Sequence, residues 1–315
     1  MPLRIVFCGT PAFALPSLRL LLAQPDFKVE GVITQPDRPR GRGQQTASSP
    51  VKDAAIAAGV AVYQPERIKS ESAQDYFKRV EPDVVVIIAY GQIIPARLIE
   101  IPRLGWINLH ASLLPKYRGA APINWAIVNG ESRTGVTTMR IDAGLDTGPM
   151  LLTREISIGA DETAPELAAR LAEAGAPLIV ETLRKLERGE ITPTPQDNSK
   201  ATHAPPLKKE DGRIDWNLNA AKIYNRIRGL QPWPGAFTTF RGKTCQIWGE
   251  PLKPVAAGGA PGIILPTKED GLLVICGGPS GFRVDHAQLE GRKRVTGLEF
   301  ANGAHIVPGE RFGSR

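Results

Sequence analysis

The sequence predicts an α/β fold in which a Rossmann-like domain with a parallel sheet is followed by a smaller domain of short β-strands. Apolar runs alternate with helical patterns through the first half of the chain, which is typical of a parallel sheet covered by helices. Short strand-like runs separated by Gly-rich turns fill residues 236–289. A length of 315 residues suits two domains, each with its own core.

The first domain is expected to open with a strand at residues 3–8 and a helix that extends to Ala23. Because Gly9 is the only glycine of a possible GxGxxG motif, the sequence does not favour a dinucleotide site here. Residues 84–89 are apolar on both faces, as expected of a strand in the middle of a sheet. Periodicity predicts further strands at 29–34, 60–63, 106–110, 134–141 and 150–158, and helices at 51–58, 70–80, 122–130 and 163–186.

A stretch rich in Pro and Thr, residues 190–206, predicts a connector between the domains. We therefore expect a first domain at residues 1–189 and a second at 207–315. The second begins with a helix near 219–228, and five short strands follow it. Such a set is typical of a small OB-like β-barrel, a fold that often binds oligonucleotides. The strands are expected at 236–240, 244–249, 261–265, 271–276 and 282–289.

The positive charge is concentrated in the second domain. The whole chain carries a formal net charge of +7. Residues 205–315 hold 16 Lys and Arg against 10 Asp and Glu, whereas residues 1–204 hold 23 against 22. A basic domain attached to a near-neutral one indicates a polyanionic partner such as nucleic acid, and the alternative is an ordinary solvated basic surface.

The three cysteines, Cys8, Cys245 and Cys276, are widely spaced and form no CxxC motif. Their spacing indicates neither a disulfide framework nor a metal site, which fits a reducing cytoplasmic compartment. No apolar run approaches the roughly 20 residues that a membrane-spanning helix requires. The first apolar run is broken by Gly9 and is expected to be a strand and not a signal peptide. A monomer is expected, because no apolar dimerisation strip is evident.

Residues 35–50, QPDRPRGRGQQTASSP, are too polar and too rich in Gly and Pro for a packed core. They predict a mobile surface loop. The loop carries Arg38, Arg40 and Arg42, and the glycines on both sides of Arg42 let its backbone approach a partner closely.

The most distinctive stretch runs from Gly105 to Gly130 and is followed by an acidic turn, DAGLDTG. Because side chains alternate along a strand, Asn108 and His110 are expected on one face. A polar pair at the carboxyl end of a strand in an α/β sheet is a common place for a ligand. Asp146 could return to His110, fix its tautomer and favour its protonated form. Taken alone, an Asn-x-His on a strand is more often structural than catalytic.

The segments NLHASLLPKYRGAAPINWAI and DAGLDTGPML closely resemble the 10-formyltetrahydrofolate-dependent formyltransferases. The rest of the chain resembles those members that act on methionyl-tRNA, less strongly after Lys208. The resemblance implies transfer of a formyl group from 10-formyltetrahydrofolate to the α-amine of initiator methionyl-tRNA, with no metal. Asn108 would stabilise the oxyanion, His110 would transfer protons, and Asp146 would hold the imidazole.

The resemblance also implies that folate lies along the carboxyl edge of the sheet, where backbone groups would bind the pterin. The residues expected there are Ile88, Tyr90, Gly91, Ser112, Leu113, Leu114, Pro115 and Gly144. Lys116 and Arg118 could meet phosphate. Arg42 falls at an important arginine of a family loop that orders on tRNA, although Gln44 and Gln45 stand where the family often has lysines.

Further tRNA contacts are expected collectively from the basic residues of the second domain, since single surface charges are usually just solvated. These residues are Lys222, Arg226, Arg228, Lys243, Arg292, Lys293 and Arg294. Three alternatives remain open at this point. A formyltransferase acting on an amino sugar nucleotide, or a formyltetrahydrofolate hydrolase, would share Asn108, His110 and Asp146. A noncatalytic RNA-binding protein would make that constellation accidental.

Overall fold

The computed structural model describes residues 1–40, 45–252, 259–267, 271–307 and 309–313. They divide into two compact units. The first comprises Met1–Pro122, Arg133–Ser157 and Ala168–Pro205, and the second comprises Ile123–Ser132, Ile158–Leu167 and Pro206–Arg315.

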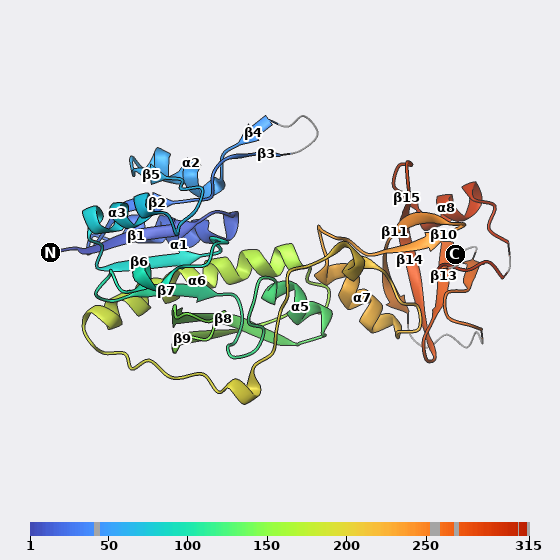
Figure 1. Cartoon of the computed structure of the whole chain (residues 1–315). Helices are drawn as coiled ribbons and strands as arrows, with labels where there is room; N and C mark the ends of the chain where they lie inside the picture. The colour runs from blue at the N-terminus through green and yellow to red at the C-terminus, as the bar shows by residue number, and fades with distance from the viewer. Residues whose placement is uncertain (41–44, 253–258, 268–270, 308, 314–315) are drawn as a thin grey trace. The chain divides into compact units, whose positions relative to one another are not determined.

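The first unit is built on a mixed sheet whose strands lie in the order β5-β2-β1-β6-β7-β8-β9 (Figure 1). The first five strands of this order are parallel, and β8 and β9 are antiparallel to their neighbours. The chain builds outward from β1 in one direction and then returns to add β6 on its other side. Ligands bind at such a switch point in open α/β sheets. The strands are β1 (Leu3–Gly9), β2 (Phe27–Ile33), β5 (Val62–Tyr63), β6 (Val84–Ile88), β7 (Trp106–His110), β8 (Arg133–Arg140) and β9 (Met150–Ser157).

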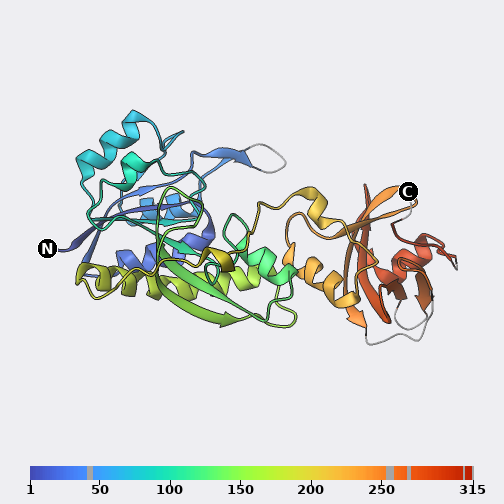
Figure 2. The same ribbon diagram turned by 60° about the horizontal axis from the view of Figure 1, so that its bottom comes forward.

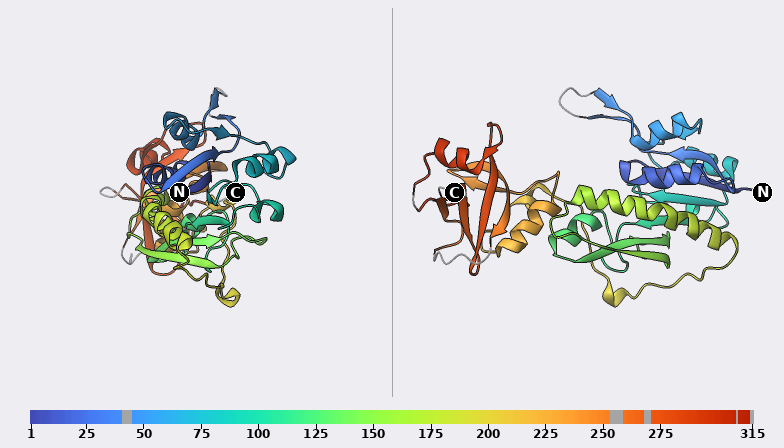
Figure 3. Two further views of the ribbon diagram at one scale, coloured as in Figure 1. Left: turned by 90° about the vertical axis from the view of Figure 1, so that its left-hand side faces the viewer. Right: turned by 180° about the vertical axis from the view of Figure 1, so that it is seen from behind.

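Helices cover the two faces of this sheet, and α1 and α6 lie on one of them (Figures 2 and 3). Ser49 and Ser70 cap α2 and α3, where each hydroxyl accepts a backbone N–H of the first turn. The helix α6 passes Gly175 and Pro177 without interruption. The helices are α1 (Leu15–Leu22), α2 (Pro50–Ala57), α3 (Glu71–Val80), α4 (Ala96–Ile99) and α6 (Ala164–Glu187). The Rossmann-like α/β prediction is confirmed.

Gly175 lets α6 pack closely on β7. A Cβ atom at this position would lie 2.4 Å from Cδ2 of Leu109. The opposite face of β7 begins with Trp106, which is fully buried and packs against Phe77 of α3 at a ring distance of 5.1 Å. Both faces of β7 are thus held by packing, so the strand gives a rigid base to the residues at its carboxyl end.

Part of the loop expected at residues 35–50 forms a hairpin of β3 (Arg38–Arg40) and β4 (Gln45–Ala47), which extends from the sheet in Figure 1. The sequence predicted a surface loop here and did not indicate this hairpin. Asp37 anchors the base of the hairpin, since it pairs with Lys52 and accepts a hydrogen bond of 2.9 Å from Gln64 Nε2. Arg42 and Gln44 lie outside the described residues.

The second unit is a curled antiparallel sheet with strands in the order β10-β11-β14-β13-β12, and β15 pairs with β14. Residues 310–313 join its edges, because Ile264 N donates to Glu310 O at 2.8 Å and Gly313 N donates to Thr239 O at 2.9 Å. The predicted small barrel is confirmed as this curled sheet. Its elements are α7 (Ala220–Gly229), β10 (Phe237–Phe240), β11 (Lys243–Leu252), β12 (Ile264–Thr267), β13 (Gly271–Cys276), β14 (Ser280–Leu289), β15 (Val295–Thr296) and α8 (Gly297–Gly303).

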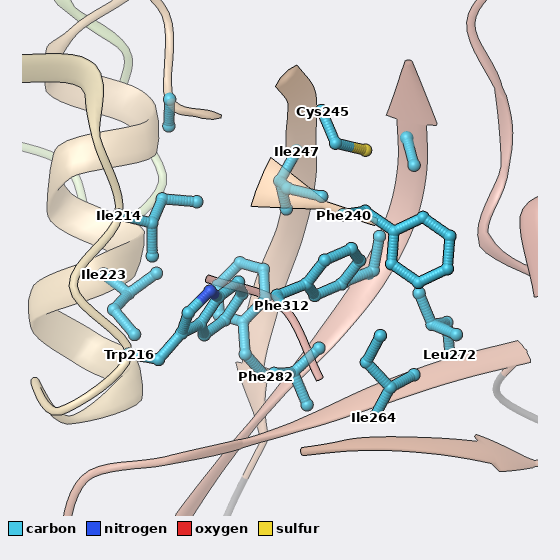
Figure 4. Packing of buried hydrophobic residues seen from close by; sticks show 14 of the residues in the cluster. Ile214, Trp216, Ile223, Phe240, Cys245, Ile247, Ile264, Leu272, Phe282 and Phe312 are labelled. Carbon is cyan, nitrogen blue, oxygen red and sulfur yellow. The ribbon is translucent and has the colours of Figure 1, made fainter. Parts of the chain in front are cut away.

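Aromatic rings fill the core of this second unit (Figure 4). Trp216 stacks on Phe312 with ring centroids 5.7 Å apart, and Phe240 meets Phe312 edge-on at the same distance. The indole N–H of Trp216 donates to Thr238 Oγ1 at 3.0 Å, so the one polar atom of this ring is satisfied. Phe312 thereby ties the final segment of the chain into the core. Among the described residues, no helix combines the length and hydropathy that a membrane crossing requires.

Candidate active site

Asn108 and His110 project from the carboxyl end of β7 on the face opposite Leu109, which packs on α6. His110 is 5% exposed, and Asn108 is half-buried. In the part of the chain that the structure describes, no hydrogen bond of the Asn108 side chain is found. Its amide N–H groups therefore remain available to a ligand.

The surroundings of the His110 ring define its neutral tautomer. Nε2 lies 2.9 Å from the carbonyl oxygen of Tyr117, which can only accept a hydrogen bond. Nε2 therefore carries the proton, and the free lone pair of the neutral ring is on Nδ1. Tyr117 is held in turn, because its backbone N–H donates to Thr202 Oγ1 at 2.8 Å. Nδ1 is thus the nitrogen able to exchange a proton with a substrate.

Asp146 lies beside that nitrogen, with 3.6 Å between Oδ2 and Nδ1. This distance exceeds a hydrogen bond, and both groups are largely shielded from solvent, since only 13% of the Asp146 side chain and 6% of the His110 side chain are exposed. The same Oδ2 accepts the backbone N–H of Gly119 at 2.8 Å, which fixes the carboxylate. Catalytic contacts of this kind often shorten when a substrate binds.

The turn that carries Asp146 is tightly constrained, although its tip is exposed. Asp142 Oδ1 accepts Gly144 N–H at 3.0 Å and Thr147 Oγ1–H at 2.7 Å. A Cβ atom at Gly148 would lie 1.9 Å from the carbonyl oxygen of Arg140, so only glycine fits there. Asp146 itself has a φ of 53°, a left-handed conformation that is uncommon for a residue with a side chain.

The segment 112–115 shapes the site through contacts of its own. Ser112 is fully buried, and its hydroxyl donates to Lys116 O at 2.6 Å. Thr137 Oγ1 donates to Ser112 O at 2.7 Å and accepts from Leu114 N at 3.3 Å. Ser112 and Leu114 therefore use these polar groups within the protein. The side chains of Leu113 and Pro115 are half-buried.

A cavity of about 680 Å³ opens at the switch point, beyond the carboxyl ends of β1, β2 and β6. Tyr90 and Gly91 of the expected folate residues contribute to its wall, whereas Asn108, His110 and Asp146 do not. The side chains of Ile88 and Tyr90 are buried, so a ligand would meet the backbone of this segment. The lining residues are Thr10, Pro11, Gln35, Pro36, Asp37, Arg38, Ala47, Ser49, Ala89, Tyr90 and Gly91.

Arg118 differs from its expected role. It is 5% exposed, and its guanidinium donates to Gln196 Oε1 and Asn198 Oδ1, in each case with a contact of 2.8 Å. It is therefore committed to the connector instead of facing a phosphate. The sequence analysis did not single out Gln196. The composition of a Pro-rich connector does not indicate which loop its side chains will contact.

The residues expected to bind tRNA fall into two groups, those whose side chains are buried or half-buried and those that are exposed. Arg228 is 6% exposed and donates to the carbonyls of Gly159 and Glu162, at 3.1 and 2.9 Å. Its guanidinium is thus internal, and the expected tRNA contact of this residue is withdrawn. Arg226 is half-buried and donates to Asp211 O at 2.6 Å. The exposed residues are Arg38, Lys222, Lys243, Arg292, Lys293 and Arg294, while Arg40 lies on β3.

Lys243 and residues 292–294 come together in the second unit. Lys243 begins β11, and the neighbouring residue Thr244 accepts the backbone N–H of Glu290, which follows β14. The guanidinium of Arg294 lies 4.1 Å from the ring centroid of Trp248. The basic residues 292–294 therefore follow the end of β14 that pairs with the start of β11, and Arg294 lies over Trp248 in the middle of that strand.

The three cysteines are free and buried. Burial raises the pKa of the Cys8 thiol well above its usual value and raises the pKa of Cys245 and Cys276 to about 12. Such thiols are poor nucleophiles at neutral pH. Among the described residues, no group of His, Cys, Asp and Glu side chains is arranged to hold a metal ion.

Comparison with protein families identifies the class of this enzyme. Residues 3–183 match the formyl transferase family, and residues 206–305 match the formyl transferase C-terminal domain. The chain therefore belongs to the formyl transferase family.

Similar proteins with curated names share a more specific name than that of the family. The chain is 54% identical over 311 residues to the methionyl-tRNA formyltransferase of Solibacter usitatus, covering 99% of both chains. It is 51% identical over 310 residues to the protein of the same name from Koribacter versatilis, covering 98% of both. The resemblance to formyltransferases named for methionyl-tRNA is confirmed.

Solved structures share the fold at low sequence identity. The sugar 3N-formyl transferase WlaRD, crystallised in the presence of dTDP and 5-N-formyl-THF, has a TM-score of 0.65 and 18% identity, and the match covers 93% of this chain and 100% of that one. HypX from Aquifex aeolicus, in complex with tetrahydrofolic acid, has a TM-score of 0.63 and 17% identity over 100% of this chain and 51% of HypX. These similarities support the fold.

Proposed function

We propose that this enzyme transfers a formyl group from 10-formyltetrahydrofolate to the α-amino group of initiator methionyl-tRNA, with Asn108, His110 and Asp146 as the catalytic residues. The observation that carries the proposal is the environment of His110, whose Nε2 is fixed by a carbonyl and whose Nδ1 lies beside a carboxylate. The curated relatives support the choice of acceptor, because they cover nearly the whole chain and bear this name.

The chemistry follows from these groups. The amine attacks the formyl carbon, a C–N bond forms, and the carbonyl electrons move to oxygen. The Asn108 amide donates to this oxyanion, while Nδ1 of His110 takes a proton from the attacking nitrogen, with Asp146 assisting directly or through water. The oxyanion then collapses and the bond to the folate nitrogen breaks. His110 returns the proton to that nitrogen, which leaves tetrahydrofolate and formylmethionyl-tRNA.

Folate would lie along the carboxyl edge of the sheet, between the Ala89–Gly91 turn, the segment 112–115 and the turn containing Gly144. The left-handed backbone at Ala89 and Gly91, with φ of 50° and 86°, turns the chain sharply at the cavity wall. A cavity of this size accommodates a small-molecule ligand. The free amide of Asn108 supplies the donor that the formyl oxygen requires.

The tRNA would be bound by the second domain, proposed here as residues 207–315 after a connector at 190–206 and a catalytic domain at 1–189. The net charge of +6 in the last third of the chain supports this assignment. The exposed cluster of Lys243 and Arg292–Arg294 is the strongest candidate surface. Arg38 and Arg40 on the hairpin would approach the acceptor end, together with Arg42, which lies outside the described residues.

A competition assay tests the acceptor. The enzyme receives limiting 10-formyltetrahydrofolate with charged initiator methionyl-tRNA, free methionine and an amino sugar nucleotide, and formylated products are separated by mass spectrometry. We expect formylmethionyl-tRNA as the dominant product. Formylation of the sugar amine would indicate a formyltransferase that acts on an amino sugar nucleotide. Release of formate alone would indicate a formyltetrahydrofolate hydrolase. A His110→Ala control should bind tRNA with nearly unchanged affinity but lack transfer.

A further inference from the structure

The turn that carries Asp146 is held from outside by the side chain of Gln196. The amide nitrogen of Gln196 donates to the carbonyl oxygens of Asp146 and Gly148, at 2.8 and 2.7 Å. Leu145 in the same turn is 66% exposed, so apolar packing does not fix the tip. Since Asp146 has a positive φ, a turn without this support would relax toward more common backbone conformations.

The orientation of the Gln196 amide is determined by its partners. Its oxygen accepts Nε and Nη2 of Arg118, at 3.0 and 2.8 Å, while its nitrogen donates to the two carbonyls. A flipped amide would place its oxygen against two carbonyl oxygens and its nitrogen against a cation. Arg118 is itself buried and fixed by Asn198. The amide is therefore locked at both ends.

The same connector also holds the loop that orients His110. Arg118 N donates to Thr202 O at 2.8 Å, and Ala204 N donates to Arg118 O at 2.7 Å. Gly119, whose N–H fixes the Asp146 carboxylate, lies so close to the connector that a Cβ atom there would be 2.5 Å from Ala204 O. Both partners of the imidazole, Tyr117 O and Asp146, thus depend on residues 196–204.

We infer that Gln196 is a positioning residue for catalysis, which, with Arg118, sets the Asp146 turn against His110. This inference rests on the proposed function, because its effect is expressed through proton transfer at Nδ1. The hydrogen bonds of Gln196 go to Arg118 and to the Asp146 turn, so it acts on His110 through that turn. Its loss should lower the rate of the chemical step while substrate binding changes little, since a displaced Asp146 stabilises the protonated ring less well.

Gln196→Glu is the sharpest test. The variant keeps the size of the side chain and an acceptor for Arg118, but its carboxylate has no N–H to donate to Asp146 O and Gly148 O. Gln24→Glu is a matched control, because Gln24 also accepts from an arginine, Arg184, at 2.8 Å and donates to a carbonyl, Leu20 O, at 3.0 Å. Gln24 lies next to the amino end of β2, whereas the site lies at the carboxyl ends of the strands.

We expect Gln196→Glu to lower kcat at least about tenfold with KM for both substrates within about threefold, and to shift the pH dependence of kcat. Gln24→Glu should match the wild type in all three quantities. A wild-type kcat and pH profile in Gln196→Glu would overturn the inference. If the wild-type chain itself formylates no methionyl-tRNA, the proposed function fails instead.

A second readout does not require activity. The imidazole nitrogens of ¹⁵N-histidine-labelled enzyme report tautomer and hydrogen bonding, and His110→Gln assigns the resonance among the four histidines. Gln196→Glu and the milder Gln196→Asn should both shift the His110 signals, and Gln24→Glu should not. Unchanged His110 signals in folded Gln196→Glu would overturn the positioning role even if the natural acceptor proved to be different.

Discussion

Replacing Asp146 with asparagine isolates the charge beside His110. Oδ1 of the asparagine can still accept the Gly119 N–H, so the turn should keep its conformation. The same oxygen position lies 3.6 Å from Nδ1 of His110, so a neutral amide oxygen then stands where the carboxylate oxygen stood. The substitution therefore removes the negative charge beside the reactive nitrogen and keeps the hydrogen bond that holds the turn.

The structure sets the size of this effect. Two unit charges 3.6 Å apart interact by about 4–5 kcal/mol at an effective dielectric constant near 20. Residual solvent screening and the dipole of the asparagine reduce the loss to about 3–4 kcal/mol in the transition state. This corresponds to a fall in kcat of about 10²- to 10³-fold.

The assay is single-turnover formylation of charged tRNA at saturating folate, with tRNA affinity measured separately. Asp142→Asn serves as the control, because Asp142 lies in the same turn and an asparagine oxygen can accept from both Gly144 and Thr147. We expect Asp142→Asn to keep its rate within about threefold. An Asp146→Asn enzyme that remained within the same range, or equal losses in both variants, would refute the assigned role of the carboxylate.

Three further outcomes are expected. Asn108→Ala should lower kcat by about 10²- to 10³-fold with little change in KM, because an oxyanion donor acts mainly in the transition state. Arg228→Met should destabilise the protein by about 2–4 kcal/mol in urea unfolding, since buried carbonyls lose their donor, whereas Lys222→Met on the exposed part of α7 should cost less than about 0.5 kcal/mol. Native enzyme should resist iodoacetamide at pH 8.5 but react fully in denaturant, because burial raises the pKa of Cys8, Cys245 and Cys276.

The elements of the first domain could be predicted from the sequence because each has a strong local pattern. The run at Val84–Ile88 is apolar at every position and became a fully buried strand next to β1. The i, i+2 spacing of Asn108 and His110 placed both on one face of β7. The β3–β4 hairpin was missed because its residues have the composition of an irregular loop, and only pairing across the turn reveals it.

Other features depend on contacts between residues far apart in the sequence. Arg228 has the same local pattern as a surface arginine of an amphipathic helix, and its burial follows only from the carbonyls of Gly159 and Glu162. Gln196 lies 50 residues from Asp146 along the chain, in a segment whose composition predicts a simple connector. The closure of the barrel by residues 310–313 likewise could not be predicted from local sequence, because it depends on contacts with strands far away along the chain.

The most direct test of the account is the stoichiometry of one turnover. Enzyme is mixed with 10-formyltetrahydrofolate and excess charged initiator methionyl-tRNA, and tetrahydrofolate and formylmethionyl-tRNA are quantified in the same sample. The account predicts one formylmethionyl-tRNA for each tetrahydrofolate released, and neither product with His110→Ala. Tetrahydrofolate released without formylmethionyl-tRNA would contradict the proposed acceptor, and an active His110→Ala enzyme would contradict the proposed mechanism.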